Sequence, residues 1–279
     1  MRSTPHRCIA ALTLFLLLTP IKAQDSLYNR NTTHATSFGV GSAKHLDTYL
    51  SPLEYSGLQI HFLRETLRPI QLGCGHVSFQ GIIHTEFSMT QDKPEKGNEI
   101  GGSVSYSAAW HYNFNVGPLR LLAGSQISGT LGALYNTRNT NNPVQVQANT
   151  KLALSVAGIY GFHIKRQHFT VREQFDLALI GLMFSPDYGQ SYYEIFSENN
   201  SGDNTCFTTI VNAPSWRNQL TIDFPLRDHT FRAGYLMDIR QSHVNHIKHH
   251  TYSHAFIIGW VKHFTYKKRR QALRDNFIM

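Results

Sequence analysis

Residues 103–116 read SVSYSAAWHYNFNV, and along this stretch apolar and polar side chains alternate. Every second residue from Val104 to Val116 is apolar or aromatic, whereas the residues between them are small or polar. A period of two places all the apolar side chains on one face of a β-strand. The stretch therefore predicts an amphipathic strand.

The same alternation runs through residues 76–90 and 144–164. Strands of soluble sheets usually have about 5–6 residues, whereas a tilted strand that crosses a bilayer needs about 9–11. The apolar faces carry almost no charge, with Glu173 as the main exception. A Lys or Arg facing lipid at mid-depth would cost roughly 2–4 kcal/mol. Length and charge together predict lipid against the apolar face and a polar interior.

The connections between these segments alternate between short turns and longer polar loops. This alternation is typical of outer-membrane barrels, whose short turns lie in the periplasm. We therefore predict an all-β fold, an antiparallel up-and-down transmembrane β-barrel over residues 24–266, with eight or twelve strands as the alternatives to ten. The ten predicted strands are residues 36–47, 55–66, 76–90, 102–115, 119–135, 144–164, 169–184, 214–224, 230–240 and 251–266.

The composition excludes several other classes of protein. Charged residues make up 16 % of the 279 residues, well below the roughly 25 % of soluble domains. Three cysteines exclude a disulfide-dense scaffold. The ordered apolar patterning also argues against a disordered chain. One large β-rich domain remains.

Residues 1–23 read as a secretory signal peptide. Arg2 and Arg7 form its basic start, residues 9–18 are apolar, and Ala23 precedes a plausible cleavage point. The apolar run is shorter than the ~20 residues of a spanning helix. The last segment, residues 267–279, is a basic tail that we expect to be solvated or to contact anionic surfaces. An exported chain without a basic stripe elsewhere is not expected to bind nucleic acid.

Residues 47–55 read DTYLSPLEY and follow the sequence FGVG at residues 38–41. This motif resembles the opening of a family of exported proteins from Bacteroides- and Prevotella-type bacteria, catalogued as a domain of unknown function. The resemblance implies an outer-membrane setting and brings no known activity. Within the motif, Pro52 has no backbone N–H for a ladder, so we expect pairing to end there.

The inward faces of the predicted strands carry acids, bases and histidines. Eight strands enclose an interior that side chains fill, and sixteen leave a channel, so we expect a ten-stranded lumen to be filled by ion pairs and hydrogen bonds. No cofactor is predicted. The predicted polar network of the lumen comprises Glu86, His111, Arg172, Asp176, Arg217, Asp223, Arg232 and Asp238.

A histidine-rich join is predicted at residues 241–250, with His243, His246, His249 and His250. Neutral imidazoles bind zinc, copper or nickel, so weak capture of a metal ion is one interpretation. The other is a solvated loop whose charge rises below pH about 6.5.

These features leave three hypotheses about function. The first is an outer-membrane barrel, surrounded by lipid and inserted by the barrel-assembly machinery, with a structural or ligand-binding role through its loops. The second is an enzyme at the outer rim that acts on lipid or peptide, for which His84, Glu86 and Ser88 lie on one face of one strand. The third is a soluble periplasmic β-sandwich that binds a ligand.

Overall fold

The computed structural model describes residues 31–70, 76–93, 97–197 and 204–265. The predicted signal peptide (1–23) and basic tail (267–279) lie outside these residues. Within them, no helix is long and apolar enough to cross a membrane. The elements are β1 (Asn31–Asp47), β2 (Ser51–Ile70), β3 (Val77–Asp92), β4 (Asn98–Val116), β5 (Leu119–Asn136), β6 (Val144–Ile164), β7 (Gln167–Phe184), α2 (Tyr192–Phe196), β8 (Thr205–Thr209), β9 (Ser215–Leu226), β10 (His229–Val244) and β11 (Ile247–Thr265).

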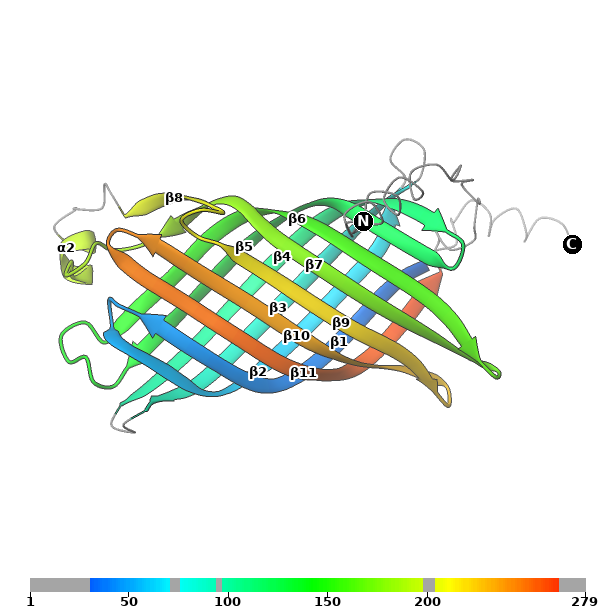
Figure 1. Cartoon of the computed structure of the whole chain (residues 1–279), viewed down its shortest axis with the longest axis horizontal. Coiled ribbons are helices and arrows are strands. Elements are labelled where there is room, and N and C mark those ends of the chain that lie inside the picture. The colour runs from blue at the N-terminus through cyan, green and yellow to red at the C-terminus, as the bar shows by residue number, and fades with distance from the viewer. Residues whose placement is uncertain (1–30, 71–75, 94–96, 198–203, 266–279) are drawn as a thin grey trace, which may run out of the picture.

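The strands form one antiparallel sheet that closes on itself (Figure 1). Neighbours along the chain pair with each other, and β1 also pairs with β11 over its whole length, from Asn31 opposite Thr265 to Asp47 opposite His249. β6 and β7 complete the ring. The predicted barrel is confirmed, and the closed ring rules out the sandwich alternative.

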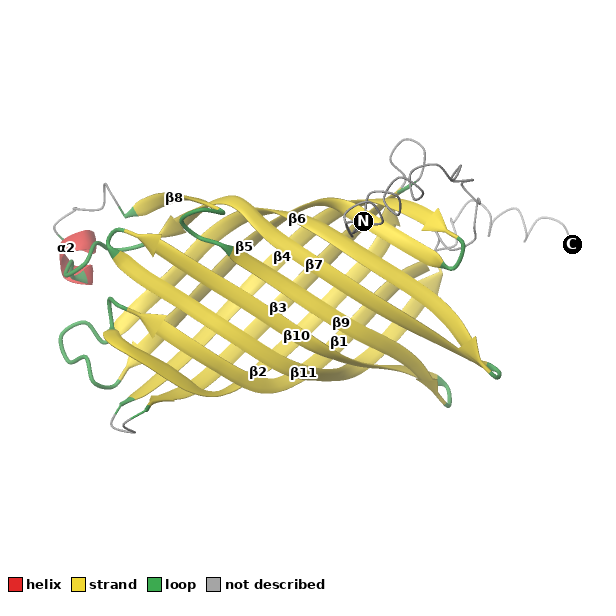
Figure 2. Ribbon diagram, viewed as in Figure 1, coloured by secondary structure: helices red, strands yellow, loops and turns green. Residues whose placement is uncertain are grey.

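Ten strands close the barrel, as predicted, although eleven are present. β8 pairs with the C-terminal part of β7 at Ile180–Phe184, and β9 pairs with its N-terminal part at Thr170–Leu177. β8 and β9 are therefore one interrupted strand. The residues between them still bond to β10, since the Gln241 and His243 N–H groups donate to the carbonyl oxygens of Pro214 and Asn212. The expected loop at 185–213 thus contains part of a strand (Figure 2).

The two faces of the sheet have the polarity of a membrane barrel. On β4, Val104 faces outward with 51 % of its surface exposed, whereas His111 faces inward with 1 % exposed. The same division runs around the ring, with Ile60, Ile127 and Phe256 among the exposed apolar side chains. An exposed apolar belt is costly in water and favourable in hydrocarbon.

The strands are longer than predicted, and two connections differ as a result. β10 and β11 extend until only Asn245 and His246 separate them, so the expected ten-residue join is a two-residue turn. Both turn residues have positive φ, 47° and 60°, which is the geometry of a type I′ turn, and Asn tolerates it well. At the other corrected connection, pairing does not end at Pro52. It is interrupted there by a bulge, because His45 pairs with Tyr55 and Asp47 pairs with Ser51.

The apolar belt predicts a depth-dependent response to charge. Ile127 lies near the middle of β5 and faces outward. We expect Ile127→Arg to destabilise the barrel in lipid vesicles by about 2–4 kcal/mol, and Tyr135→Arg, near the end of the same strand, by about 0–1 kcal/mol. Denaturant unfolding in vesicles measures both. Equal effects of the two substitutions would contradict the placement of the belt.

Candidate functional site in the barrel lumen

An ion pair crosses the full width of the lumen. Glu65 lies on β2 and Arg172 on β7, and these strands are five positions apart in both directions around the ten-membered ring. The Arg172 guanidinium bonds to Oε1 of Glu65, and both side chains are buried. This contact therefore joins diametrically opposite strands through the lumen.

The second carboxylate oxygen of Glu65 links a third strand into the same level. Arg232 on β10 donates to Glu65 Oε2 at 2.8 Å, and it also binds Asp223 on β9 through two bonds, of 2.7 and 2.9 Å. Fork-shaped pairs of this kind are among the strong charge-assisted bonds. Asp223 and Arg232 are opposite each other in the β9–β10 register, so the local pair is set by the sheet.

Amides and hydroxyls continue the network toward the middle of the barrel. Gln80 on β3 donates to Glu65 at 3.0 Å and to Gln174 on β7 at 2.8 Å. Gln174 in turn donates to Asp176, whose carboxylate also accepts from Arg217 at 2.9 Å. Ser155 connects this carboxylate to His111, at 2.5 and 2.9 Å. Most polar side chains here therefore have partners, as buried polar groups require.

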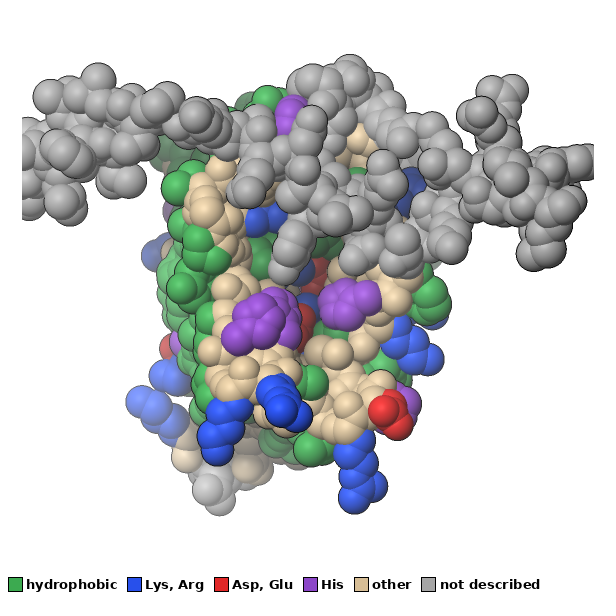
Figure 3. All heavy atoms as spheres, turned by 90° about the vertical axis from the view of Figure 1, so that its right-hand side faces the viewer, with side chains coloured by type: hydrophobic (Ala, Val, Ile, Leu, Met, Phe, Trp, Pro, Cys, Tyr) green, Lys and Arg blue, Asp and Glu red, His purple; other side chains and the backbone are tan. Residues whose placement is uncertain are grey.

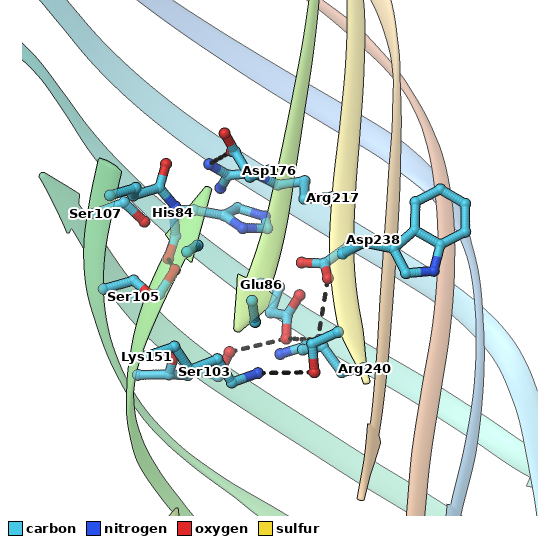
Figure 4. Close-up of a pocket in the computed structure, with 17 residues that line it drawn as sticks. His84, Glu86, Ser103, Ser105, Ser107, Lys151, Asp176, Arg217, Asp238 and Arg240 are labelled. Carbon is cyan, nitrogen blue, oxygen red and sulfur yellow. Dashed lines mark hydrogen bonds and ion pairs between the residues drawn. The ribbon is translucent and has the colours of Figure 1, made fainter. Parts of the chain in front are cut away.

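A second charged level lies nearer the end of the barrel that carries α2. Glu86 on β3 and Arg240 on β10 bond across the lumen, and Asp238 Oδ1 is 3.7 Å from Arg240 Nε. Figure 4 shows these side chains converging on a cavity of about 80 Å³. Lys151 on β6 points into the same space and donates to Ser215 at 3.1 Å. The cavity has room for a few water molecules.

The charges of these two levels balance. Burying a charge is expensive unless a partner of opposite sign accompanies it, and five carboxylates face five cations. We call this set the lumen network. Its carboxylates are Glu65, Glu86, Asp176, Asp223 and Asp238, and its cations are Lys151, Arg172, Arg217, Arg232 and Arg240.

The structure brings together the side chains predicted for the lumen, and it adds Glu65 as the residue that joins them. Sequence reasoning missed Glu65 and the inward-facing His61 on β2. Alternation alone identifies their face, because Gln59, His61 and Glu65 share it. The alternation of polar and apolar residues is obscured on β2. Leu63 also points inward, where it packs with Leu236 and Ile257, and the charged Arg64 points outward.

The four histidines of the expected join lie on different faces. His243 and His250 point away from the lumen, and His249 points inward, with its Nδ1 3.3 Å from Asp47 Oδ2. His246 lies in the turn 3.2 Å from Asp187, and this hydrogen bond lowers the pKa of Asp187. Metal capture by these four side chains stays a prediction, and it would require the turn to rearrange.

The three residues considered for a rim enzyme each bond elsewhere. His84 contacts His61, and Glu86 binds Arg240. Ser88 Oγ is 3.0 Å from His45 Nε2, but a threonine hydroxyl, that of Thr251, contacts the other ring nitrogen of His45. Ser88 is buried. His84, Glu86 and Ser88 therefore do not form the linked triad of a serine hydrolase.

The end of the barrel that carries α2 is a folded rim. Tyr49 and Leu50, between β1 and β2, pack with Leu134, Ile247 and Tyr192. Tyr49 donates to the carbonyl oxygen of Gln190 at 2.8 Å, and Tyr192 donates to Gln145 at 2.9 Å. Burial raises the pKa of both phenols to about 12, so both remain protonated donors at neutral pH. These contacts join the β1–β2 connection and the connection that carries α2 to the ends of β5, β6 and β11.

The opposite end of the barrel carries hollows. Figure 3 looks onto this end, where histidines and basic side chains gather on the part of the rim in view. Two hollows of about 430 Å³ open there, one lined by His163 and the other by His263, with His168 in both. Asp223 lines the second hollow. Through Asp223, the second hollow reaches the lumen network.

The closed ring, the apolar exterior and the polar interior define a β-barrel of the outer-membrane type. Residues 9–271 match the model of the family described as protein of unknown function (DUF3316). The match spans most of the chain, and the protein belongs to this family. The resemblance to a family of unknown function is thereby confirmed.

Several solved outer-membrane barrels are similar in architecture. The transport unit of the autotransporter AIDA-I from Escherichia coli has a TM-score of 0.42 at 8 % identity, over 93 % of this chain and 99 % of that one. The translocator domain of the autotransporter NalP from Neisseria meningitidis gives 0.38 at 10 %, over 91 % and 95 %. The COG4313 outer membrane channel from Pseudomonas putida F1 gives 0.35 at 7 %, over 88 % and 100 %. The likeness concerns the fold alone. No curated protein sequence matches the chain.

The central position of Glu65 predicts a large effect of its replacement. Glu65→Gln leaves Arg172 and Arg232 without their shared carboxylate, and we expect a loss of about 3–5 kcal/mol in the free energy of unfolding. The matched control is Glu54→Gln, which removes a carboxylate from the exposed pair with Lys44 and should change stability by at most about 1 kcal/mol. Denaturant titration of both variants in detergent provides the comparison. Similar small losses would mean that the network is not a structural element.

Proposed function

We propose that this protein is an outer-membrane barrel with a closed lumen, which supports a folded extracellular rim and acts by binding at that rim. The observation that carries the proposal is the pair Glu65–Arg172, because it joins opposite strands. The Glu86–Arg240 pair closes a second level. A permeation pathway would need both pairs to separate and several buried charges to lose their partners.

The rim supplies the surface for binding. Tyr188, Tyr193 and Phe196 are exposed on the connection between β7 and β8, and their backbone is held by the packing of Tyr192 against Tyr49. Exposed aromatic side chains on a fixed backbone are common at interaction surfaces. The ordered contacts among the connections favour a preformed binding surface, which loses less entropy on binding than a mobile one.

The location of the protein in the outer membrane belongs to the same proposal. The exposed apolar belt requires lipid, and export through residues 1–23 followed by insertion by the barrel-assembly machinery would deliver the chain to the outer membrane. The motif at residues 47–55 suggests a Bacteroides- or Prevotella-type host. We propose that the barrel is oriented with the start of β1 and the end of β11 on the periplasmic side, and with α2 outside the cell.

An enzyme at the rim is less well supported by the geometry. Its best feature is the contact between Ser88 and His45. A hydrolase needs an accessible nucleophile and a base oriented by an acid. Ser88 is buried, and the neighbour of His45 is the Thr251 hydroxyl, so neither requirement is met.

Ion conductance tests the closed lumen. We expect the native protein in a planar bilayer to show no steady open-channel current. The triple variant Glu65→Ala/Arg172→Ala/Arg232→Ala removes the first charged level, which is centred on Glu65. It should produce discrete conductance steps. The control Lys44→Ala/Glu54→Ala removes an exposed ion pair and should remain silent. Stable channel currents from the native protein would overturn the proposal of a closed barrel.

Lysine labelling tests the orientation. Lys248 is exposed beside the turn between β10 and β11, and Lys165 is exposed in the turn between β6 and β7 at the other end. An amine reagent that cannot cross the outer membrane should modify Lys248 on intact cells. It should modify Lys165 only after the outer membrane is permeabilised, and peptide mass spectrometry distinguishes the sites. The reverse pattern would place α2 in the periplasm.

A further inference from the structure

We propose that His61, His84 and Glu86 form a binding site for one divalent transition-metal ion in the lumen, with Zn²⁺ as the best-matched ion. One ligand atom from each side chain lies within 4.8 Å of the others. Among the described residues, this is the group of histidine, cysteine and carboxylate side chains that meets this geometry. The site is independent of the rim and goes beyond the proposed binding function.

The sheet places the three side chains together. His61 on β2 and Glu86 on β3 are direct partners in the antiparallel register, and His84 precedes Glu86 by two residues on the same inward face. Their exposed fractions are 3 % for His61, 4 % for His84 and 8 % for Glu86. The site therefore stands on two adjacent strands of a closed barrel, which hold ligand positions more rigidly than a loop does.

The two imidazoles already have nearly the spacing of metal ligands. His61 Nδ1 and His84 Nε2 are 2.9 Å apart, and the rings are stacked with centroids 5.2 Å apart. Zinc binds histidine nitrogen at about 2.0–2.1 Å in a tetrahedral arrangement, which places two such nitrogens roughly 3.3 Å apart. In the hydrogen-bonded pair one nitrogen carries a proton. On metal binding that proton moves to the other nitrogen of the same ring, and both rings remain neutral.

Glu86 provides a second and independent indication. Its Oε1 accepts bonds from Arg240 and, at 2.8 Å, from Ser103. Its Oε2 is buried and has no hydrogen-bond partner. A buried carboxylate oxygen without a partner loses its solvation without compensation. A metal ion at Oε2 would provide the partner, while Arg240 and Ser103 orient the carboxylate from behind, as outer residues do in metal sites.

The ligand set indicates which ion fits. Two imidazoles and one carboxylate suit Zn²⁺ and related transition metals, whereas Mg²⁺ and Ca²⁺ prefer an all-oxygen environment. Three protein ligands leave a fourth tetrahedral position open for water. His84 and Glu86 line the cavity of about 80 Å³ (Figure 4), which provides the space for that water.

The proposal is tested on the full mature chain, folded in detergent and stripped with a chelator. We expect Zn²⁺ titrated by calorimetry to bind with a stoichiometry of one. Co²⁺ at the same site should give the visible absorption bands of a four-coordinate nitrogen and oxygen site, and Zn²⁺ should abolish them. His84→Ala and His61→Gln should each weaken zinc binding by more than about 100-fold, and Ser103→Ala by about 10-fold.

A control at the rim separates this site from the histidines near the turn. His246→Ala/His249→Ala removes two imidazoles outside the proposed site and should leave zinc affinity unchanged. Heat-modifiable gel mobility confirms folding of each variant. If His84→Ala does not fold, the His61→Gln variant and the Co²⁺ spectrum of the native protein test the site. Absence of stoichiometric zinc binding to the native protein would overturn the proposal. Binding that survives His84→Ala and His61→Gln but is lost in the rim variant would also overturn it.

Discussion

Hydrocarbon offers no hydrogen-bond partner to the peptide backbone, and this constraint explains the architecture. A sheet in a membrane must close, because every N–H and C=O on an open edge would be left without a partner. The long β1–β11 pairing, from Asn31 to Asp47, removes the edges. Even where the strand opposite β7 is interrupted between β8 and β9, Asn212 and Pro214 still accept bonds from β10. The ladder is thus continued by irregular backbone at the rim.

Closure also determines where the polar side chains go. One face of every strand meets lipid and must be apolar, so the inward faces of all ten strands share one narrow interior. Charges gathered there must be paired, because buried unpaired charges are costly. The lumen network meets this requirement with equal numbers of acids and bases. Its longest links, Glu65–Arg172 and Glu86–Arg240, connect strands that are distant in the ring. The same contacts that neutralise the interior therefore also cross it.

The two ends of the barrel differ for a related reason. At the end away from α2, short turns such as Lys165–Arg166 between β6 and β7 need few contacts. At the other end, the long connection that carries α2 must pack its apolar residues. Tyr49, Leu50 and Tyr192 provide that packing. Between the ends, the network leaves Oε2 of Glu86 without a hydrogen-bond partner beside two imidazoles. The barrel interior thus combines tightly paired charges with one group of side chains whose geometry suits a metal ion.

The ten strands and the direction of most side chains follow from the amino-acid sequence alone, because a period of two is a local property of each strand. It also indicated which side chains enter the lumen, from Glu86 to Asp238. Which of these side chains contact one another is a property of the folded barrel, since contacts across the ring depend on the stagger and closure of all ten strands. Glu65 became the centre of the network for this reason. The histidines at 243–250 diverged, because the strands extended to a two-residue turn and alternation sent neighbouring side chains to opposite faces.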